Sequence, residues 1–310
     1  MRTSIQNAVL PAASWHEHAR THAERVDALV ADHLHRRQNK KSHPVHDFLF
    51  TYYSYRPSQL RRWHPGYGIT LVDAEEFTGL RGYEVTDDAA AVTSEFLTAQ
   101  QDLIGGTHAL LTATAGRAAN TGCFGLHEWA MVYRTEKPRH DLPLRLGSAG
   151  TDTVVRSHRI ACSHFDAYRF FTDAARERNT LRPGRDDRVE FEQPGCLHAG
   201  MDLYKHAFRL SPLIRSELIA DCFELAREIR ILDVRASPYD VTSLGYPPVP
   251  IETAQGKREY AAAQQAFSQR ATPLRSELIG QCERLMATLD QAGATTVRPA
   301  ADAARASSTS

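Results

Sequence analysis

The sequence predicts a mostly α-helical protein with a single multi-helix domain and a small β-hairpin near residues 66–85. Three observations support this fold class. Apolar residues recur at helical spacing over most of the chain, β-prone pieces gather in one short stretch, and no Pro-, Gly- or Ser-rich linker separates the helical segments. At 310 residues and 42% hydrophobic composition, the chain is long enough to bury about three quarters of its unfolded surface.

The first helix is expected over about residues 15–36. Ser14-x-x-Glu17 has the form of a capping box, and apolar residues follow at every third or fourth position. Residues 1–13 before this helix are expected to be flexible. Five histidines of the helix lie mostly off its apolar stripe and are expected on a solvated face, namely His16, His18, His22, His33 and His35.

The remaining elements follow from aromatic and apolar patterns. The aromatic segment 47–55 predicts a buried helix, and the β-prone pieces 69–72 and 83–85 predict the hairpin. Further helices are expected at about 93–116, 123–134, 164–178, 196–210, 213–234 and 256–291. The last helix should break or bend near Pro273. The helical domain is thus expected over 14–292, and the Ala/Ser/Thr-rich segment 293–310 is expected to be a disordered tail.

Composition narrows the function classes. The 37 Lys and Arg residues offset 37 Asp and Glu residues, so no overall positive field would recruit a nucleic acid. None of the five cysteines lies in a C-x-x-C pair, which argues against a zinc or dithiol motif. No secretory segment and no run of about 18 apolar residues occurs, so we expect a cytoplasmic protein without a membrane partner. Neither a Walker A loop nor a G-x-G-x-x-G motif indicates a nucleotide cofactor.

Histidine stands out with 15 residues, and several gather with carboxylates between residues 122 and 206. His127 and Glu128 are adjacent in an apolar, aromatic stretch, where a buried charge has to be paired or ligated. A core histidine with a satisfied hydrogen bond is the alternative there. We take His127 and Glu128 as acid/base candidates or as groups that orient metal ligands.

Two further segments offer metal ligands. His164-x-Asp166 opens a predicted helix, with His158 six residues earlier, although the pair could equally serve to cap the helix. His198, Asp202 and His206 recur at i, i+4 and i+8 and share one helical face, which could instead be a polar stripe facing solvent. From these segments we expect His164, His198 and Asp202 to be metal ligands and Asp166 to be an acid/base group.

A fourth ligand is expected from the helix over 213–234. Its carboxylates are Asp221, Glu224, Glu228 and Asp233. Metal sites in helix bundles use such inward carboxylates, whereas nearby Arg227 and Arg230 favour an exposed, salt-bridged face. Glu224, between two apolar residues, is the expected ligand. Arg235 at the helix end and Tyr53 in the aromatic segment are expected to hold the substrate.

Six longer blocks of sequence carry a family resemblance. They are HPVHDFLFTYYS (43–54), RRWHPG (61–66), FGLHEWAMVYR (124–134), CSHFDAYRFF (162–171), QPGCLHAGMDLYK (193–205) and RASPYD (235–240). In these blocks the chain resembles a bacterial family often labelled 3-methyladenine DNA glycosylase, over most of residues 10–275. The resemblance implies excision of alkylated bases from DNA. In that activity Asp202 or Glu128 would activate water, in an aromatic pocket of Tyr52, Tyr53 and Trp63.

The residues themselves predict a metal-dependent oxidoreductase or hydrolase that acts on a small molecule. The expected cofactor is a divalent metal, with iron as the first candidate, held by His164, His198, Asp202 and Glu224. Two alternatives stay open: a DNA N-glycosylase, with DNA as the partner, and a non-catalytic module that binds a metal or another ligand.

Overall fold

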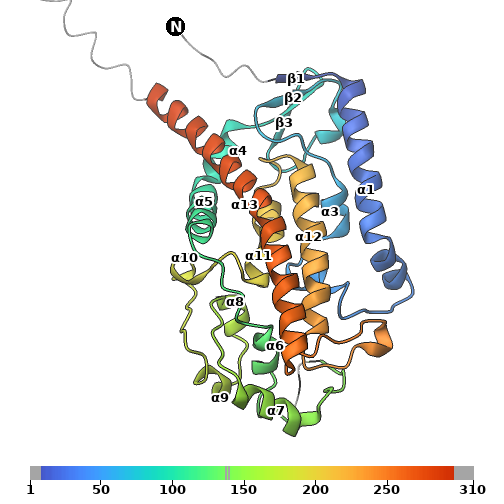
Figure 1. Cartoon of the computed structure of the whole chain (residues 1–310). Helices are drawn as coiled ribbons and strands as arrows, with labels where there is room; N and C mark the ends of the chain where they lie inside the picture. Colours follow the sequence, from blue (N-terminus) through green and yellow to red (C-terminus); the bar gives the residue numbers. More distant parts are fainter. Residues whose placement is uncertain (1–7, 137, 139, 297–310) are drawn as a thin grey trace, which may run out of the picture.

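The computed structural model describes residues 8–136, 138 and 140–296 (Figure 1). These residues form thirteen α-helices and one four-stranded sheet, which confirms a mostly α, single-domain fold. The longer helices are α1 (Ala12–Gln38), α5 (Gln101–Ala115), α7 (Gly147–Ser157), α11 (Leu197–Arg209), α12 (Ser216–Arg235) and α13 (Ala254–Thr296). None of the helices in the described chain is long and apolar enough to cross a lipid bilayer.

Helix α11 lies in the middle of the helical core. It packs on α12 and α13, while α5 packs on α13 and α1 on α12 (Figure 1). Gly200 allows the close approach of α11 to α12, because a Cβ at this position would lie 3.0 Å from Ile229 Cδ1. Every residue from Leu197 to Tyr204 is buried. A polar side chain on this part of α11 must therefore find its partners inside the protein.

The sheet lies at one end of the helical core and is larger than the predicted hairpin (Figure 1). Its strands are β1 (Ala8–Leu10), β2 (Ile69–Leu71), β3 (Tyr83–Thr86) and β4 (Ala89–Val92), in the order β1-β2-β4-β3. The hairpin is formed by β3 and β4, which turn at Asp87 and Asp88 with φ of 49° and 66°. Positive φ at both central residues matches the twist of a two-residue hairpin. The sequence placed the hairpin too early because β2 pairs with β4 and not with β3.

The N-terminal segment also differs from expectation. Residues 8–10 form β1 by pairing in parallel with β2, and α1 begins at Ala12, so the prediction of a flexible 1–13 is wrong from residue 8 onward. Residues 1–7 lie outside the described residues. The capping box at Ser14 does not form, because Pro11 is the N-cap residue and Glu17 pairs with Arg20 at 2.7 Å.

One histidine of α1 is not on a solvated face. His22 is 3% exposed, and its Nε2 lies 2.9 Å from the carbonyl oxygen of Leu60 on the neighbouring α3 (Pro57–Arg61). His16, His18 and His35, in contrast, are exposed as expected, and His33 is half-buried with its Nδ1 2.7 Å from Asp47 Oδ1.

Several predicted helices are shorter than their apolar patterns. The short elements are α2 (Phe48–Tyr52), α3 (Pro57–Arg61), α4 (Ser94–Ala99), α6 (Leu126–Ala130), α8 (Phe165–Tyr168), α9 (Asp173–Arg176), α10 (Arg188–Phe191), η1 (Glu75–Phe77) and η2 (Thr242–Leu244). Segments 123–134 and 164–178 are apolar because their turns and short helices are buried against the core. The apolar pattern of these two segments therefore indicates that they are buried, and it does not indicate the length of their helices.

The final helix bears on two expectations. Helix α13 continues through Pro273, so the helix is not broken there, and Figure 1 shows the long helix changing direction between its two ends. Proline removes one backbone donor, and contacts with α5, α11 and α12 hold the helix against the core. The helix also includes residues 293–296 of the predicted tail, and residues 297–310 lie outside the described residues.

The turn into α11 gives a stability prediction. A Cβ on Gly195 would lie 2.7 Å from the backbone oxygen of Asn120 and 2.9 Å from its nitrogen. We therefore expect Gly195→Ala to lower the free energy of unfolding by about 1–3 kcal/mol. Gly106→Ala is the control, because nothing lies within 4 Å of a Cβ there and alanine should stabilise helix α5 by up to about 1 kcal/mol. Denaturant titration measures both, and equal stability of the two variants would contradict this packing.

Candidate metal centre

Three helices bring buried ionisable side chains to one place. Helix α6 supplies His127 and Glu128, α11 supplies His198, and α12 supplies Arg230 and Asp233, all at most 7% exposed. One ligand atom each from His127, His198 and Asp233 lie within 4.8 Å of one another. We call these three residues the first cluster, and such a group could hold a metal ion.

The approach of the chain to α6 sets where His127 and Glu128 lie. Phe124 and Gly125 both have left-handed backbone, with φ of 47° and 70°, and together they reverse the chain just before α6. A side chain at Gly125 would meet the ring of Tyr260 at 3.3 Å in addition to the strain of its positive φ. This glycine lets α6 lie directly against the core helices.

Hydrogen bonds link the first cluster to two neighbouring charges. His127 Nε2 lies 2.8 Å from Asp233 Oδ1. Arg230 Nη1 donates to Asp233 Oδ2 at 2.6 Å and to Glu128 Oε1 at 3.0 Å. Both oxygens of the fully buried Asp233 are thereby partnered. The hydrogen bond between His127 and Asp233 orients the His127 imidazole in the absence of a metal, and a metal held by both groups would take the place of the proton that they share.

Burial and these neighbours shift the pKa values in opposite directions. Burial alone would lower the pKa of His127, but the carboxylate of Asp233 raises it above its usual value. Burial alone would raise the pKa of Asp233, but His127 and Arg230 hold it well below the usual range. Burial, together with His127, lowers the pKa of His198 well below 6.5. His198 is therefore neutral at pH 7, the form in which imidazole binds metals.

A second cluster lies beside the first. One ligand atom each from His164, Asp166 and Asp202 lie within 4.8 Å of one another. Its carboxylates are already neutralised by cations, because Lys205 Nζ contacts Asp202 Oδ2 and lies 3.2 Å from Asp166 Oδ2. Arg188 Nη2 donates to Asp202 Oδ2 at 3.0 Å. Burial alone would raise the pKa of Asp202, but Lys205 and His164 hold it well below its usual value.

His164 of the second cluster is fully buried. Its Nε2 lies 3.3 Å from Asp202 Oδ2 and 3.6 Å from Glu192 Oε1, yet neither ring nitrogen makes a hydrogen bond in the described chain. A buried imidazole without a hydrogen bond is costly. Its approach to two carboxylates offsets that cost through charge.

His198 joins the two clusters. Its ring stands edge-on to His127 with centroids 4.5 Å apart, and it stacks on His164 with centroids 5.2 Å apart. The three imidazoles thus form a row between Asp233 and Asp202. Because His198 contacts a ring of each cluster, a structural change in either cluster would alter the surroundings of His198.

A small cavity of about 70 Å³ opens onto this row. It is lined by Phe48, Tyr52, Glu128, Met131, His140, Asp166, Phe170, His198, Arg230 and Tyr239. The volume has room for several water molecules or a small organic group. The first cluster reaches the cavity through His198, and the second through Asp166. Its walls combine aromatic surface with a few polar groups, which is typical of ligand sites.

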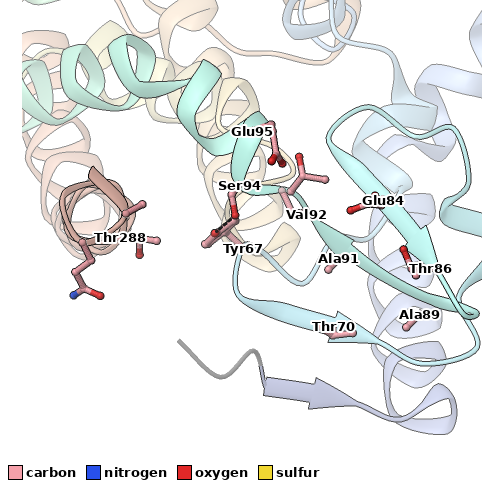
Figure 2. Close-up of a pocket in the computed structure, with 13 residues that line it drawn as sticks. Tyr67, Thr70, Glu84, Thr86, Ala89, Ala91, Val92, Ser94, Glu95 and Thr288 are labelled. Carbon is pink, nitrogen blue, oxygen red and sulfur yellow. Dashed lines mark hydrogen bonds between the residues drawn. The ribbon is translucent and has the colours of Figure 1, made fainter. Parts of the chain in front are cut away.

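A much larger cavity of about 800 Å³ lies far from the histidines, between the sheet and the C-terminal part of α13 (Figure 2). Its described walls carry hydroxyl groups and two carboxylates, from Glu84 and Glu95, but no imidazole or thiol. Thr288 of α13 stands apart from the strands across an open space (Figure 2). The volume of a cavity alone therefore does not indicate where the candidate site of this protein lies.

Most of the expected site residues meet at the clusters or the cavity. These are His127, Glu128, His164, Asp166, His198 and Asp202. Tyr53 also lies there, but it does not line the cavity: its hydroxyl donates to Asp202 Oδ1 at 2.7 Å. The neighbouring Tyr52 lines the cavity in its place. Trp63 is far from this aromatic wall, since it packs under the sheet and its Nε1 donates to Glu217 Oε1.

Glu224 is not part of either cluster, which corrects the expected ligand set. Its Oε2 lies 2.7 Å from Arg25 Nη2, and its side chain is 46% exposed. Asp233 is the carboxylate of α12 that faces inward, on the same side as the buried Ala226 and Ile229. Arg230, expected on an exposed face, is also on this inner side. Residues 226, 229, 230 and 233 recur at helical spacing, and this periodicity is the sequence pattern that indicates the inward-facing side of α12.

Arg235 does not reach the cavity either. Its Nε donates to the carbonyl oxygen of Pro247, and its Nη2 lies 3.3 Å from Glu259 Oε1. It ties the end of α12 to the following loop. The arginine that lines the cavity is Arg230.

Two other histidines of the region stay outside the clusters. His158 Nδ1 lies 2.7 Å from the carbonyl oxygen of Val154, within its own helix end. His206 is buried on α11, where burial and Lys205 lower its pKa to about 3. Of the two histidines in the α11 stripe, only His198 belongs to a described group of possible metal ligands.

The first cluster is the better fit for a divalent metal. Two imidazoles and one carboxylate are the donor set of non-haem iron sites that keep open positions. The second cluster offers one imidazole and two carboxylates, but Lys205 and Arg188 already contact Oδ2 of Asp202, and Oδ1 accepts from the Tyr53 hydroxyl. A metal there would have to displace a bound cation.

Comparisons with protein-family models, with curated proteins and with solved structures gave no match to this chain.

The His127–Asp233 pair gives a pH prediction for the metal-free protein. Asp233→Asn removes the charge that raises the pKa of His127, so burial should then bring this pKa below 6.5. A raised histidine pKa stabilises the fold below pH 6.5, and that contribution is lost as pH rises through the folded-state pKa. The variant should therefore lose more stability at pH 5 than at pH 9.

Titration of the His127 imidazole by NMR measures the shift. Asp221→Asn on the same helix is the control, because Asp221 pairs with Arg25 near the surface. An unchanged His127 pKa in Asp233→Asn would contradict the assigned cause.

Proposed function

We propose that this protein is a metal-dependent enzyme that acts on a small molecule in the cavity beside the first cluster. His127, His198 and Asp233 would hold a divalent metal, with iron as the first candidate. The observation that supports this most is that three buried donor atoms of this set lie within 4.8 Å of one another and border the cavity through His198. Three protein ligands leave coordination positions free for substrate or water.

A divalent metal bound there would supply Lewis acidity or redox chemistry, which suits hydrolysis or oxidation. The surrounding side chains have separate roles. Arg230 holds Asp233 Oδ2 and so fixes the orientation of that carboxylate. Glu128 shares the same Arg230 nitrogen and lines the cavity, where it is positioned to take a proton from a substrate or a water molecule.

The second cluster helps to hold His198 of the first cluster in position. Lys205 and Arg188 neutralise Asp202, and the Tyr53 hydroxyl fixes its other oxygen. This holds His164 against the ring of His198. Asp166 reaches the cavity from this cluster and is a second group that could move a proton.

Metal content tests the proposal. Purified protein loaded with Fe²⁺ under anaerobic conditions and then desalted should retain metal by elemental analysis. His198→Ala removes a neutral imidazole of the first cluster, and weakening the metal site by one ligand should lower the retained metal at least about tenfold. Glu224→Gln is the control, because Glu224 pairs with Arg25 outside the clusters and should leave the metal content unchanged.

Three results would change the conclusion. No metal above background, or equal metal in His198→Ala and wild type, would remove the metal site. Release of free base from alkylated DNA by the metal-free protein would replace the proposal with the glycosylase activity that the resemblance implies. Metal retention with no turnover of any small molecule would leave a binding module.

A further inference from the structure

In the described part of the chain, the guanidinium of Arg230 donates hydrogen bonds through Nη1, to both Glu128 and Asp233. Arg230 is 3% exposed and lines the cavity. Its Nε is buried and has no hydrogen-bond partner in the described chain. Nε and Nη2 form the lateral edge of a guanidinium, which binds a carboxylate through two parallel hydrogen bonds.

The surroundings make an unpartnered Nε costly. The guanidinium carbon lies 3.9 Å from the centre of the Phe48 ring, and Tyr52 and Phe170 line the same cavity. A buried donor without an acceptor in such apolar surroundings costs free energy. A ligand that brings an acceptor to Nε recovers that cost, and its apolar part meets aromatic walls.

The charges beside the cavity favour a negative ligand once a metal is bound. Glu128 and Asp233 together outweigh Arg230, but a divalent cation on the first cluster reverses that balance. Asp166 is the other carboxylate of the cavity wall, and Lys205 lies 3.2 Å from its Oδ2. Opposite charges at such short range attract strongly where water is largely excluded.

We propose that the Nε edge of Arg230 binds the carboxylate of the substrate, so that the substrate is a small carboxylic acid with a short apolar body that fits a cavity of about 70 Å³. This assignment rests on the proposed function for its charge balance, since the bound metal adds the positive charge. The hydrogen-bonding geometry rests on Arg230 alone.

Calorimetric titration with matched probes tests the assignment. Acetate and propionate supply the carboxylate, acetamide and propionamide are neutral probes of the same shape, and ethylamine is a cation of similar size. On protein loaded with Zn²⁺, which is inert to oxidation, the better carboxylate should bind at least about tenfold tighter than its amide. Removing the metal should weaken carboxylate binding and leave amide binding nearly unchanged.

Two arginine variants locate the effect. Arg230→Lys keeps the charge but loses the two-pronged edge, so it should bind the carboxylate about tenfold more weakly while its preference over the amide shrinks. Arg235→Lys is the matched control on the same helix and should bind like wild type. Melting temperature and zinc content are measured for both, and the comparison of acid with amide on wild type stands even if Arg230→Lys fails to fold.

Each outcome is decisive. Equal binding of acid and amide, tighter binding of ethylamine, no carboxylate binding at millimolar concentration, or wild-type affinity in a folded Arg230→Lys would overturn the assignment. Protein that retains no zinc but binds propionate in an Arg230-dependent way would remove the proposed metal function and keep the carboxylate site. Protein that retains zinc but binds acid and amide equally would keep the proposed metal site and remove the carboxylate site.

Discussion

Asp233 has no exposure to solvent, and the cost of burying its charge determines the arrangement around it. A buried carboxylate is tolerated only when charged or hydrogen-bonding partners surround it. His127 takes one oxygen and Arg230 takes the other. The first bond fixes the orientation of an imidazole in the first cluster. The second commits Nη1 of Arg230, so the proposed metal site and the proposed carboxylate-binding edge both depend on this carboxylate.

The two clusters differ in how their charge is neutralised. In the second, Lys205 and Arg188 come within bonding distance of Asp202, so the protein supplies its own cations. In the first, Arg230 is shared between two carboxylates, and His198 is a neutral ring. A site that retains negative charge and a neutral imidazole attracts an external cation, whereas an internally paired site is a rigid support. One cluster therefore suits chemistry and the other suits positioning.

Sequence patterns predicted the site in part. The stripe of His198 and Asp202 on α11 faces inward, which decides between the two orientations that the sequence left open, and His127 with Glu128 is buried, as the apolar stretch around them indicated. On α12 the same reasoning chose Glu224, which is paired with Arg25, and missed Asp233. The error concerned the face of the helix. Glu224 has two apolar neighbours in the chain, but adjacent residues of a helix point in different directions, so these neighbours do not place it on the buried face. Asp233 lies on that face because it is three or four residues from other buried positions.

The sequence by itself determined the mostly helical class, the long helices and the residue types that enter the core, because 3.6-residue periodicity is a local property of the backbone. The tertiary structure decided which charges meet. His127 and Asp233 are 106 residues apart, and Tyr53 and Asp202 are 149 apart, so no local pattern relates them. Pairing of that kind arises when helices distant in sequence pack together, and the burial that follows decides which carboxylate needs which cation.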